Sequence, residues 1–531
     1  MSGEITFSDE LLTGLTPEQR EAVTSPERQI LVRATAGSGK THVLTLRIQR
    51  RVARREHEAG AVLALTFTRK AADELRRRLA RASIRDVRAG TFHRAALTIV
   101  NEHRSDLGRP PAVIEASRRR LVSAVAESMT AEGMRIEDWQ VPRLEVELGW
   151  ALSQGLTGHT YLAHVRRHRR DSPLRAADFA DLLDRYVGLC RSRGVLDFDL
   201  LLTEAIALLR DVPAVRASVR HRTRALYVDE AQDMNPLQFA LLRELGGEDP
   251  DLFSVGDANQ SIYGFNGANP RLLGELVATW PRTVTIDLTR NHRSTAPIVR
   301  VASTLLETGA RGISPAREHG EIPVVRAYDA DDEEASNVVR WLTLHHHPGV
   351  AWRDLAVLAR TNAQLDPVAR ALEAAGVPYE RRGPEHAPAS DLISSGAGRQ
   401  SPPDNPDAVA LSTIHRAKGL EFTGVAAIGW AEGQLPHYAA VAADQLEEER
   451  RLAYVALSRA EEHLLITWSR GRNDPRFPDR EPSRFLTPVE DAVRELERQA
   501  APVTGEALHR RLAAIRRELA ASLESASEPE Q

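Results

Sequence analysis

Two short segments carry the residue types that nucleotide chemistry requires. Residues 34–41 read ATAGSGKT, and residues 227–233 read YVDEAQD. The first pattern is typical of a phosphate-binding loop, because glycines at 37 and 39 let backbone N–H groups turn toward phosphate oxygens. The second pattern ends an apolar run in two adjacent carboxylates, which can hold Mg²⁺ and a water molecule. Together they indicate that this chain binds and hydrolyses a nucleoside triphosphate.

The rarity of lysine points to one residue of the loop. Among 70 Lys and Arg residues only three are lysines, at positions 40, 70 and 418. A planar arginine cannot replace a compact ammonium between two phosphates, so we expect Lys40 to reach the β- and γ-phosphates. Thr41, Asp229 and Glu230 are assigned to the metal site, and Glu230 can also orient or deprotonate the attacking water.

Composition bounds the class of protein. A chain of 531 residues with 42% hydrophobic and 27% charged residues suits a globular protein of more than one domain. No apolar run is long enough to span a bilayer, the acidic N-terminus lacks a signal-peptide core, and the single cysteine, Cys190, excludes a disulfide framework. These features predict a cytoplasmic protein without membrane contact. The net charge of −4 means that nucleic acid would have to be bound by local arginine tracks.

Apolar runs alternate with helical patterns twice along the chain, which predicts an α/β fold with parallel sheets. Strands are expected at 29–34, 62–67, 225–229, 252–256 and 284–288, and again at 322–328, 355–360, 409–413, 424–429 and 463–468. We assign a first lobe to 1–93 and 206–284, an inserted helical subdomain to 94–205, and a second lobe to 285–383 and 408–490. Residues 384–407 read as a Pro/Ser-rich linker, and 491–531 as a tail that passes from helical to disordered.

Further motifs follow in a fixed order. They are LTPEQREAV (15–23), TFTRKAADEL (66–75), GTFHRAAL (90–97), VLDFDLLL (195–202), VGDANQSIYGFNGA (255–268), LTRNHRS (288–294), STIHRAKGLEF (412–422), EERRLAYVALSRAEEHL (448–464) and PSRFL (482–486). In this order the chain resembles superfamily 1 helicases of the UvrD/PcrA/Rep family over roughly residues 10–490. The resemblance implies two RecA-like P-loop NTPase lobes that clamp ATP, with a helical insertion in the first.

The resemblance also implies roles for residues of the ATP site. Gln260 would touch the γ-phosphate, Arg293 and Arg459 would act as arginine fingers, and Glu421 would contact the ribose. With Lys40 and Glu230, the first three form the predicted catalytic set. The predicted ATP-binding residues are Gln19, Ala34, Thr35, Ala36, Gly37, Ser38, Gly39, Lys40, Thr41, His292, Arg293, Glu421 and Arg459. His292 replaces a tyrosine that usually stacks on adenine, which leaves less surface for the base.

Single-stranded DNA would lie across both lobes. Four aromatic residues stand in matched DNA motifs, where a base can stack on a ring, namely Phe67, Phe92, Tyr263 and Phe265. Phe265 is favoured because its surroundings, SIYGFNGAN, are polar and Gly-rich, whereas Phe92 could equally belong to the core. His93, His415 and Arg416 are candidate phosphate contacts.

The sequence departs most from the family in length. Only about 115 residues separate Ser294 from Val409, which leaves no room for the large subdomain that family members insert between these motifs. We therefore expect translocation on single strands with weak or deregulated unwinding.

The leading hypothesis is a Mg²⁺- and ATP-dependent 3′–5′ helicase or translocase that acts on single-stranded DNA and single/double-strand junctions in repair or recombination. Three alternatives remain. They are a translocase that clears proteins from single strands without unwinding, an ATP-switched interaction protein, and a metabolic P-loop kinase. The second lobe argues against the kinase, and the intact catalytic set argues against an inactive switch.

Overall fold

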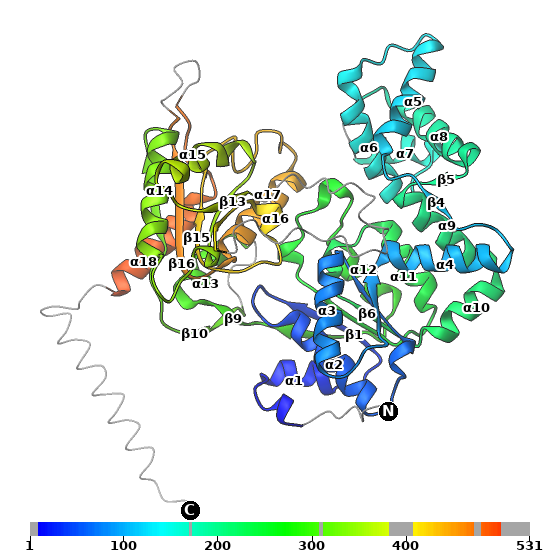
Figure 1. Ribbon diagram of the computed structural model, residues 1–531, viewed down its shortest axis with the longest axis horizontal. Coiled ribbons are helices and arrows are strands. Elements are labelled where there is room, and N and C mark those ends of the chain that lie inside the picture. The colour runs from blue at the N-terminus through cyan, green and yellow to red at the C-terminus, as the bar shows by residue number, and fades with distance from the viewer. Residues whose placement is uncertain (1–8, 169–171, 307–311, 382–406, 472–478, 501–531) are drawn as a thin grey trace, which may run out of the picture.

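Two parallel sheets, one in each lobe, organise the computed structural model, which describes residues 9–168, 172–306, 312–381, 407–471 and 479–500 (Figure 1). The first sheet has the strand order β3-β2-β6-β7-β1-β8, and every neighbouring pair is parallel. Its strands are β1 (Gln29–Ala34), β2 (Val62–Thr66), β3 (Arg88–Thr91), β6 (Ala225–Val228), β7 (Leu252–Gly256) and β8 (Val284–Leu288). The α/β fold with parallel sheets is thereby confirmed.

The first sheet forms because its strands are apolar on both faces. All residues of β2, β6 and β7 are buried, as expected for a parallel sheet that is covered by helices on both sides. The helices of this lobe include α1 (Pro17–Thr24), α2 (Lys40–Ala53), α3 (Arg69–Arg81), α10 (Pro213–Arg222), α11 (Pro236–Gly246) and α12 (Leu272–Thr279). Because α2 begins directly after the loop that leaves β1, its N-terminus faces the carboxyl edge of the sheet.

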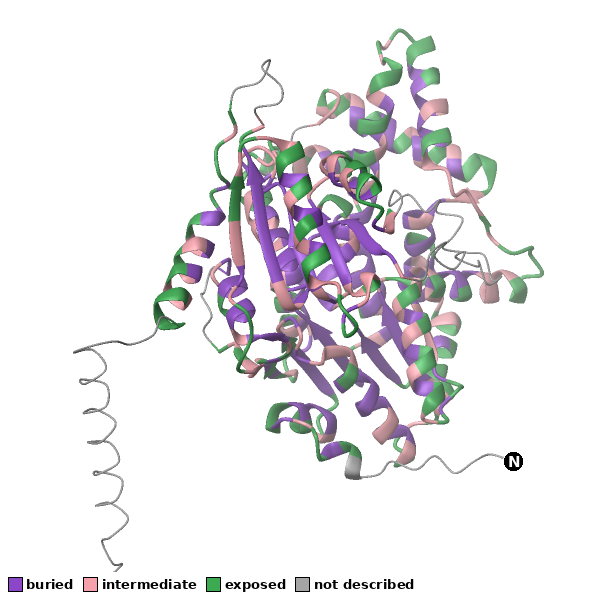
Figure 2. Ribbon diagram, turned by 60° about the vertical axis from the view of Figure 1, so that its left-hand side comes forward, coloured by how far each residue is buried: buried purple, intermediate pink, exposed green. Residues whose placement is uncertain are grey.

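The second sheet has the same build. Its order is β11-β16-β15-β12-β14-β13, again parallel throughout. The strands are β11 (Val324–Tyr328), β12 (Leu355–Ala359), β13 (Tyr379–Arg381), β14 (Val409–Thr413), β15 (Phe422–Ala427) and β16 (Ala460–Ser469). Helices α13 (Ala296–Ser303), α14 (Asp331–His345), α15 (Asp366–Ala374), α17 (Ala443–Leu457) and α18 (Leu486–Ala500) surround it. Figure 2 shows the strands largely buried between helices whose outer faces are exposed.

The helical insertion is shorter than the sequence suggested. Its own core joins α5 (Arg118–Ala131), α6 (Val141–Ser153), α7 (Gly158–His168) and α8 (Ala176–Arg193), which project from the first lobe at the upper right of Figure 1. In contrast, α4 (Phe92–Asp106) and α9 (Phe198–Asp211) pack on each other and share the core of the first sheet. The predicted range of 94–205 was therefore too wide, and the short pair β4 (Val113–Ile114) and β5 (Val195–Leu196) marks the base of the insertion.

Two other boundaries also shift. Strand β8 pairs with β1, with Ile30 opposite Val284, so the first lobe extends to Leu288 instead of ending at 284. Helix α18 continues to Ala500 and buries Val493 in the core of the second lobe, so this lobe does not end at 490. The predicted linker 384–407 lies outside the described residues except for its last residue, and the tail beyond 500 lies wholly outside them. Among the helices that are described, none is both long and apolar enough to cross a bilayer.

Candidate nucleotide and DNA site

The loop between β1 and α2 has the backbone that a phosphate-binding loop requires. Gly37 and Gly39 adopt φ angles of 69° and 82°, a region that other residues rarely enter. A Cβ atom at Gly37 would also lie only 2.8 Å from the Cβ of Arg293, so glycine is needed there for space as well. Gln19 lies beside this loop, because its Nε2 donates to the carbonyl of Ser38 at 2.9 Å.

Carboxylates from two neighbouring strands converge on this loop. The Thr41 hydroxyl donates to Asp229 Oδ2 at 3.0 Å, directly after β6. After β7, Asp257 lies with its Oδ2 3.7 Å from Lys40 Nζ. Glu230 has a φ of 53°, a left-handed conformation that costs energy for a residue with a side chain and is common at functional sites. One hydroxyl and three carboxylate groups therefore gather at this edge of the sheet, and their oxygens are of the kind that a hard divalent cation prefers.

The charges of this cluster influence one another strongly. Burial and the adjacent charge of Glu230 raise the pKa of Asp229. Burial also opposes ionisation of Glu230, but the ammonium groups of Lys40 and Lys418 lower its pKa below the usual range. Glu230 is thus held as a carboxylate next to the phosphate-binding loop, the form in which it can accept a proton or orient a water.

Arg459 brings a buried positive charge from the second lobe. It is 1% exposed and follows α17, and its Nη2 donates to Gln260 Oε1 of the first lobe at 3.1 Å. Its other guanidinium contacts are neutral acceptors, including the carbonyls of Leu420 and Val455, and no described residue forms an ion pair with it. Burial and the nearby charge of Arg293 lower the pKa of Arg459 to about 9, so it remains charged at neutral pH. A buried cation without a carboxylate partner is suited to an anionic ligand.

Three other predicted ATP-site residues lie close to the same loop. Strand β9 (Arg290–Thr295) passes it, and the His292 backbone N–H donates to the carbonyl of Gly37 at 2.8 Å. Arg293 Nε donates to Glu421 Oε2 at 2.8 Å, which joins two predicted site residues that are far apart in sequence. The structure thus brings Gln19, His292, Arg293, Glu421 and Arg459 together around the phosphate-binding loop.

An ion pair between the lobes was not expected from the sequence. The Lys418 ammonium donates to both carboxylate oxygens of Asp233, at 2.7 and 2.5 Å, and to the carbonyl of Gln260 at 2.5 Å. Both side chains are nearly fully buried. The scarcity of lysine was the available signal, because Lys418 is one of only three in the chain.

Aromatic residues of both lobes gather beside this contact. Phe67 stacks on Tyr263 with ring centroids 5.4 Å apart, and Tyr263 lies 6.1 Å from Phe265. Phe265 is also 5.6 Å from His415, which belongs to the short helix α16 (Ile414–Ala417) of the second lobe. Phe265 is 46% exposed, which is unusual for a phenylalanine and leaves one ring of the cluster accessible.

One of the predicted DNA contacts requires correction, and two others are uncharged at neutral pH. Phe92 is 2% exposed in the core of the first lobe, where no base could reach its ring. His93 packs edge-on against Phe198, and burial lowers its pKa to about 4, so it is neutral and could contact a phosphate only through an uncharged N–H group. Burial likewise lowers the pKa of His415 to about 3. Their positions in matched motifs gave no signal of burial, because a motif fixes neighbours along the chain and not across the fold.

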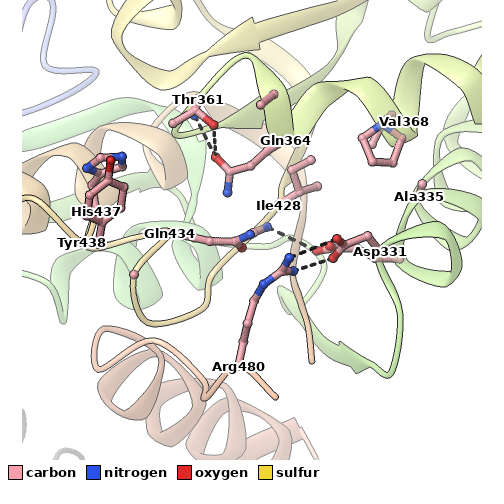
Figure 3. Close-up of a pocket in the computed structure, with 15 residues that line it drawn as sticks. Asp331, Ala335, Thr361, Gln364, Val368, Ile428, Gln434, His437, Tyr438 and Arg480 are labelled. Carbon is pink, nitrogen blue, oxygen red and sulfur yellow. Dashed lines mark hydrogen bonds and ion pairs between the residues drawn. The ribbon is translucent and has the colours of Figure 1, made fainter. Parts of the chain in front are cut away.

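A separate cavity of about 300 Å³ opens in the second lobe, away from the phosphate-binding loop (Figure 3). Its polar groups mostly satisfy one another, since Arg480 pairs with Asp331 at 2.6 Å and the backbone N–H of Thr361 donates to Gln364 at 2.8 Å. The cavity therefore does not contribute to the nucleotide site described above.

Paired parallel sheets that meet across a phosphate-binding loop are the arrangement of a P-loop NTPase with two RecA-like lobes. Comparison with known families narrows this class. The UvrD/REP helicase N-terminal domain matches residues 15–279, and the UvrD-like helicase C-terminal domain matches residues 286–385 and 393–471. This chain therefore belongs to the UvrD/Rep helicase family, as its motifs predicted.

Relatives with assigned names agree with this placement. The chain is 32% identical to the ATP-dependent DNA helicase UvrD2 of Mycobacterium tuberculosis, over 96% of this chain and 85% of the relative. It is 34% identical to UvrD1 of the same organism and 31% identical to DNA helicase II of Escherichia coli, each over 70% of this chain and about half of the relative. A solved C-terminal domain of a possible DNA helicase from Lactobacillus covers 38% of this chain and 96% of its own length, at 21% identity and a TM-score of 0.26.

Proposed function

We propose that this protein hydrolyses ATP in the cleft between its lobes and uses the cycle to move 3′–5′ along single-stranded DNA. The observation that carries the proposal is the buried guanidinium of Arg459, which has no ion-pair partner among the described residues and is held against Gln260 of the opposite lobe. A phosphate bound by the loop at 34–41 would supply the missing anion. Losing that anion would remove the attraction that draws the two lobes together, which couples hydrolysis to their movement.

Residues beside the phosphate-binding loop fit a magnesium ion. Thr41 and Asp229 would hold it, because their oxygens already face each other at 3.0 Å and Asp229 is buried. When bound, Mg²⁺ neutralises charge on the phosphate oxygens. Lys40 would bind the phosphates, and Glu230 would orient or deprotonate the attacking water. Arg293 and Arg459 would stabilise the charge that develops during transfer.

Single-stranded DNA would pass over the aromatic group formed by Phe67, Tyr263, Phe265 and His415. Both lobes contribute to this group, so a strand bound there would respond to their relative movement. Phe265 would stack on a base, which is favourable by roughly 1–3 kcal/mol whatever the sequence. The 3′–5′ direction and a role in repair or recombination are carried over from the family.

The test is ATP turnover with and without single-stranded DNA. We expect DNA to stimulate turnover in the unaltered chain. Turnover should fall by roughly 10²–10³-fold in Lys40→Ala, which removes the charge, and in Lys40→Arg, which keeps the charge but not the compact shape of the ammonium. Arg54→Ala, at the exposed end of α2, is the matched control and should keep full turnover. Retained turnover in both Lys40 variants would overturn the phosphate-loop assignment, and turnover indifferent to DNA would favour the kinase alternative.

A further inference from the structure

Three potential metal ligands converge at one edge of the second lobe, apart from the nucleotide site described above. Glu321 precedes β11, His345 ends α14, and His463 lies near the start of β16. Glu321 Oε2 lies 2.9 Å from His463 Nδ1 and 3.7 Å from His345 Nε2. All three ligand atoms lie within 4.8 Å of one another, and the imidazole centroids are 4.5 Å apart.

We propose that Glu321, His345 and His463 form a binding site for a divalent transition metal ion such as Zn²⁺. Ligand bonds of roughly 2.0–2.1 Å in a tetrahedral site place the ligand atoms about 3.3 Å apart. The two distances from Glu321 fall on either side of that value, so an ion could be accommodated by small side-chain rotations. Two imidazoles and a carboxylate favour zinc, cobalt or nickel over the harder magnesium and calcium.

The hydrogen bond behind His345 prepares this residue as a ligand. Its Nδ1 lies 2.8 Å from the backbone carbonyl of Trp341, one turn earlier in α14. A carbonyl can only accept, so Nδ1 carries the proton, and Nε2 presents its lone pair toward Glu321. Metal-binding histidines commonly make such a bond, which fixes both the tautomer and the orientation of the ring.

The burial of the two histidines and the exposure of Glu321 suit a site with one open position. The histidines are 17% and 15% exposed, whereas Glu321 is 66% exposed. The imidazoles are therefore held by the fold, and an ion can enter from the side of Glu321. Three protein ligands leave a fourth position for water or another ligand.

Such an ion would join segments that are close to the proposed arginine fingers. Strand β16 starts directly after Arg459. Arg317, four residues before Glu321, donates to the backbone carbonyl of Arg293 at 2.9 Å and pairs with Glu462. A metal here would hold the edge of the second lobe in place, and its binding would raise the thermal stability of the folded chain.

The test is metal binding by the full, untagged chain, without nucleotide or DNA, so that its outcome does not depend on the proposed function. Titration with Zn²⁺ by calorimetry and with Co²⁺ by visible absorption should reveal one tight site, with a rise in Tm. Glu321→Gln and His463→Ala should each weaken binding by more than about tenfold. His347→Ala, an exposed histidine just beyond α14, is the matched control and should bind as the unaltered chain does.

Equal metal affinity in the unaltered chain, Glu321→Gln and His463→Ala would overturn the proposal, as would an absence of binding. Either result would leave Glu321 and His463 as an ordinary ion pair. Glu321→Gln keeps the test valid if His463→Ala fails to fold, because Glu321 is largely exposed and its loss removes no core contact.

Discussion

Substitution of Arg459 should affect ATP turnover strongly and the stability of the fold little. The guanidinium of Arg459 is buried without an ion-pair partner among the described residues, so hydrogen bonds to neutral acceptors must offset the cost of burying its charge when no nucleotide is bound. We expect Arg459→Met to lower DNA-stimulated kcat by roughly 10³–10⁵-fold, the worth of an arginine finger. Its Tm should stay unchanged or rise. Steady-state turnover and a thermal melt measure the two effects.

Arg494→Met, on the exposed face of α18, is the matched control for that substitution and should change neither quantity. If Arg459→Met lowered Tm by several degrees together with kcat, the side chain would be structural, and the proposed role in charge stabilisation would fail.

Phe265 and Phe92 offer a second comparison, between an exposed and a buried ring. We expect Phe265→Ala to weaken single-stranded DNA binding by roughly 1–3 kcal/mol, through lost stacking, with little change in stability. Phe92→Ala should instead destabilise the fold by about 3–5 kcal/mol, because it leaves a cavity in the core of the first lobe. Fluorescence anisotropy with labelled DNA and urea unfolding distinguish the two. Equal loss of basal and DNA-stimulated turnover in Phe265→Ala would show that this ring, too, is structural.

At the residue scale, motifs predicted most of what surrounds the phosphate-binding loop, because the chemistry requires particular side chains at fixed spacing. They could not predict Lys418 with Asp233, whose positions are 185 residues apart and whose pairing depends on how the lobes meet. For the same reason, the burial of Phe92 was invisible in the motif that contains it.

At the scale of elements, the short helix α16 carries two adjacent residues that differ in charge. His415 is neutral, because burial lowers its pKa to about 3, whereas Arg416 has a buried Nη1 without a hydrogen-bond partner among the described residues. We expect Arg416→Ala to reduce the dependence of log K on log salt for single strands by about 0.7, the contribution of one phosphate contact. His415→Gln should leave that slope unchanged. Binding isotherms over a range of salt concentrations provide the measurement, and an unchanged slope for Arg416→Ala would remove this helix from the phosphate path.

Strands were predicted more accurately than domain boundaries, for a physical reason. Runs such as VLALT of β2 are buried on both faces, which only a covered parallel sheet allows. Helices α4 and α9 are amphipathic like those of the insertion, and periodicity reveals an apolar face without revealing what covers it. The predicted insertion of 94–205 therefore took in most of α4 and the first part of α9, although their helical nature was predicted.

At the scale of the whole molecule, this chain is shorter than UvrD2 within the region that the two share. The alignment with UvrD2 spans 606 positions, more than the 531 residues of this chain, so that relative has additional residues within the aligned region. The family's C-terminal domain matches in two parts, on either side of 386–392. This interruption falls where the sequence predicts a short linker in place of the family's inserted subdomain.

A chain without that subdomain should still translocate, because the proposed motor needs only the two lobes and the strand across them. We expect ATP-dependent strand separation from a duplex with a 3′ single-stranded tail and none from a duplex with a 5′ tail. A fluorophore and quencher on opposite strands report separation, and Lys40→Ala supplies the background without hydrolysis. Separation from the 5′ tail would contradict the proposed direction. If neither duplex opened while DNA still stimulated ATP turnover, the two lobes would suffice for stepping but not for unwinding, which would favour the translocase that clears proteins from single strands.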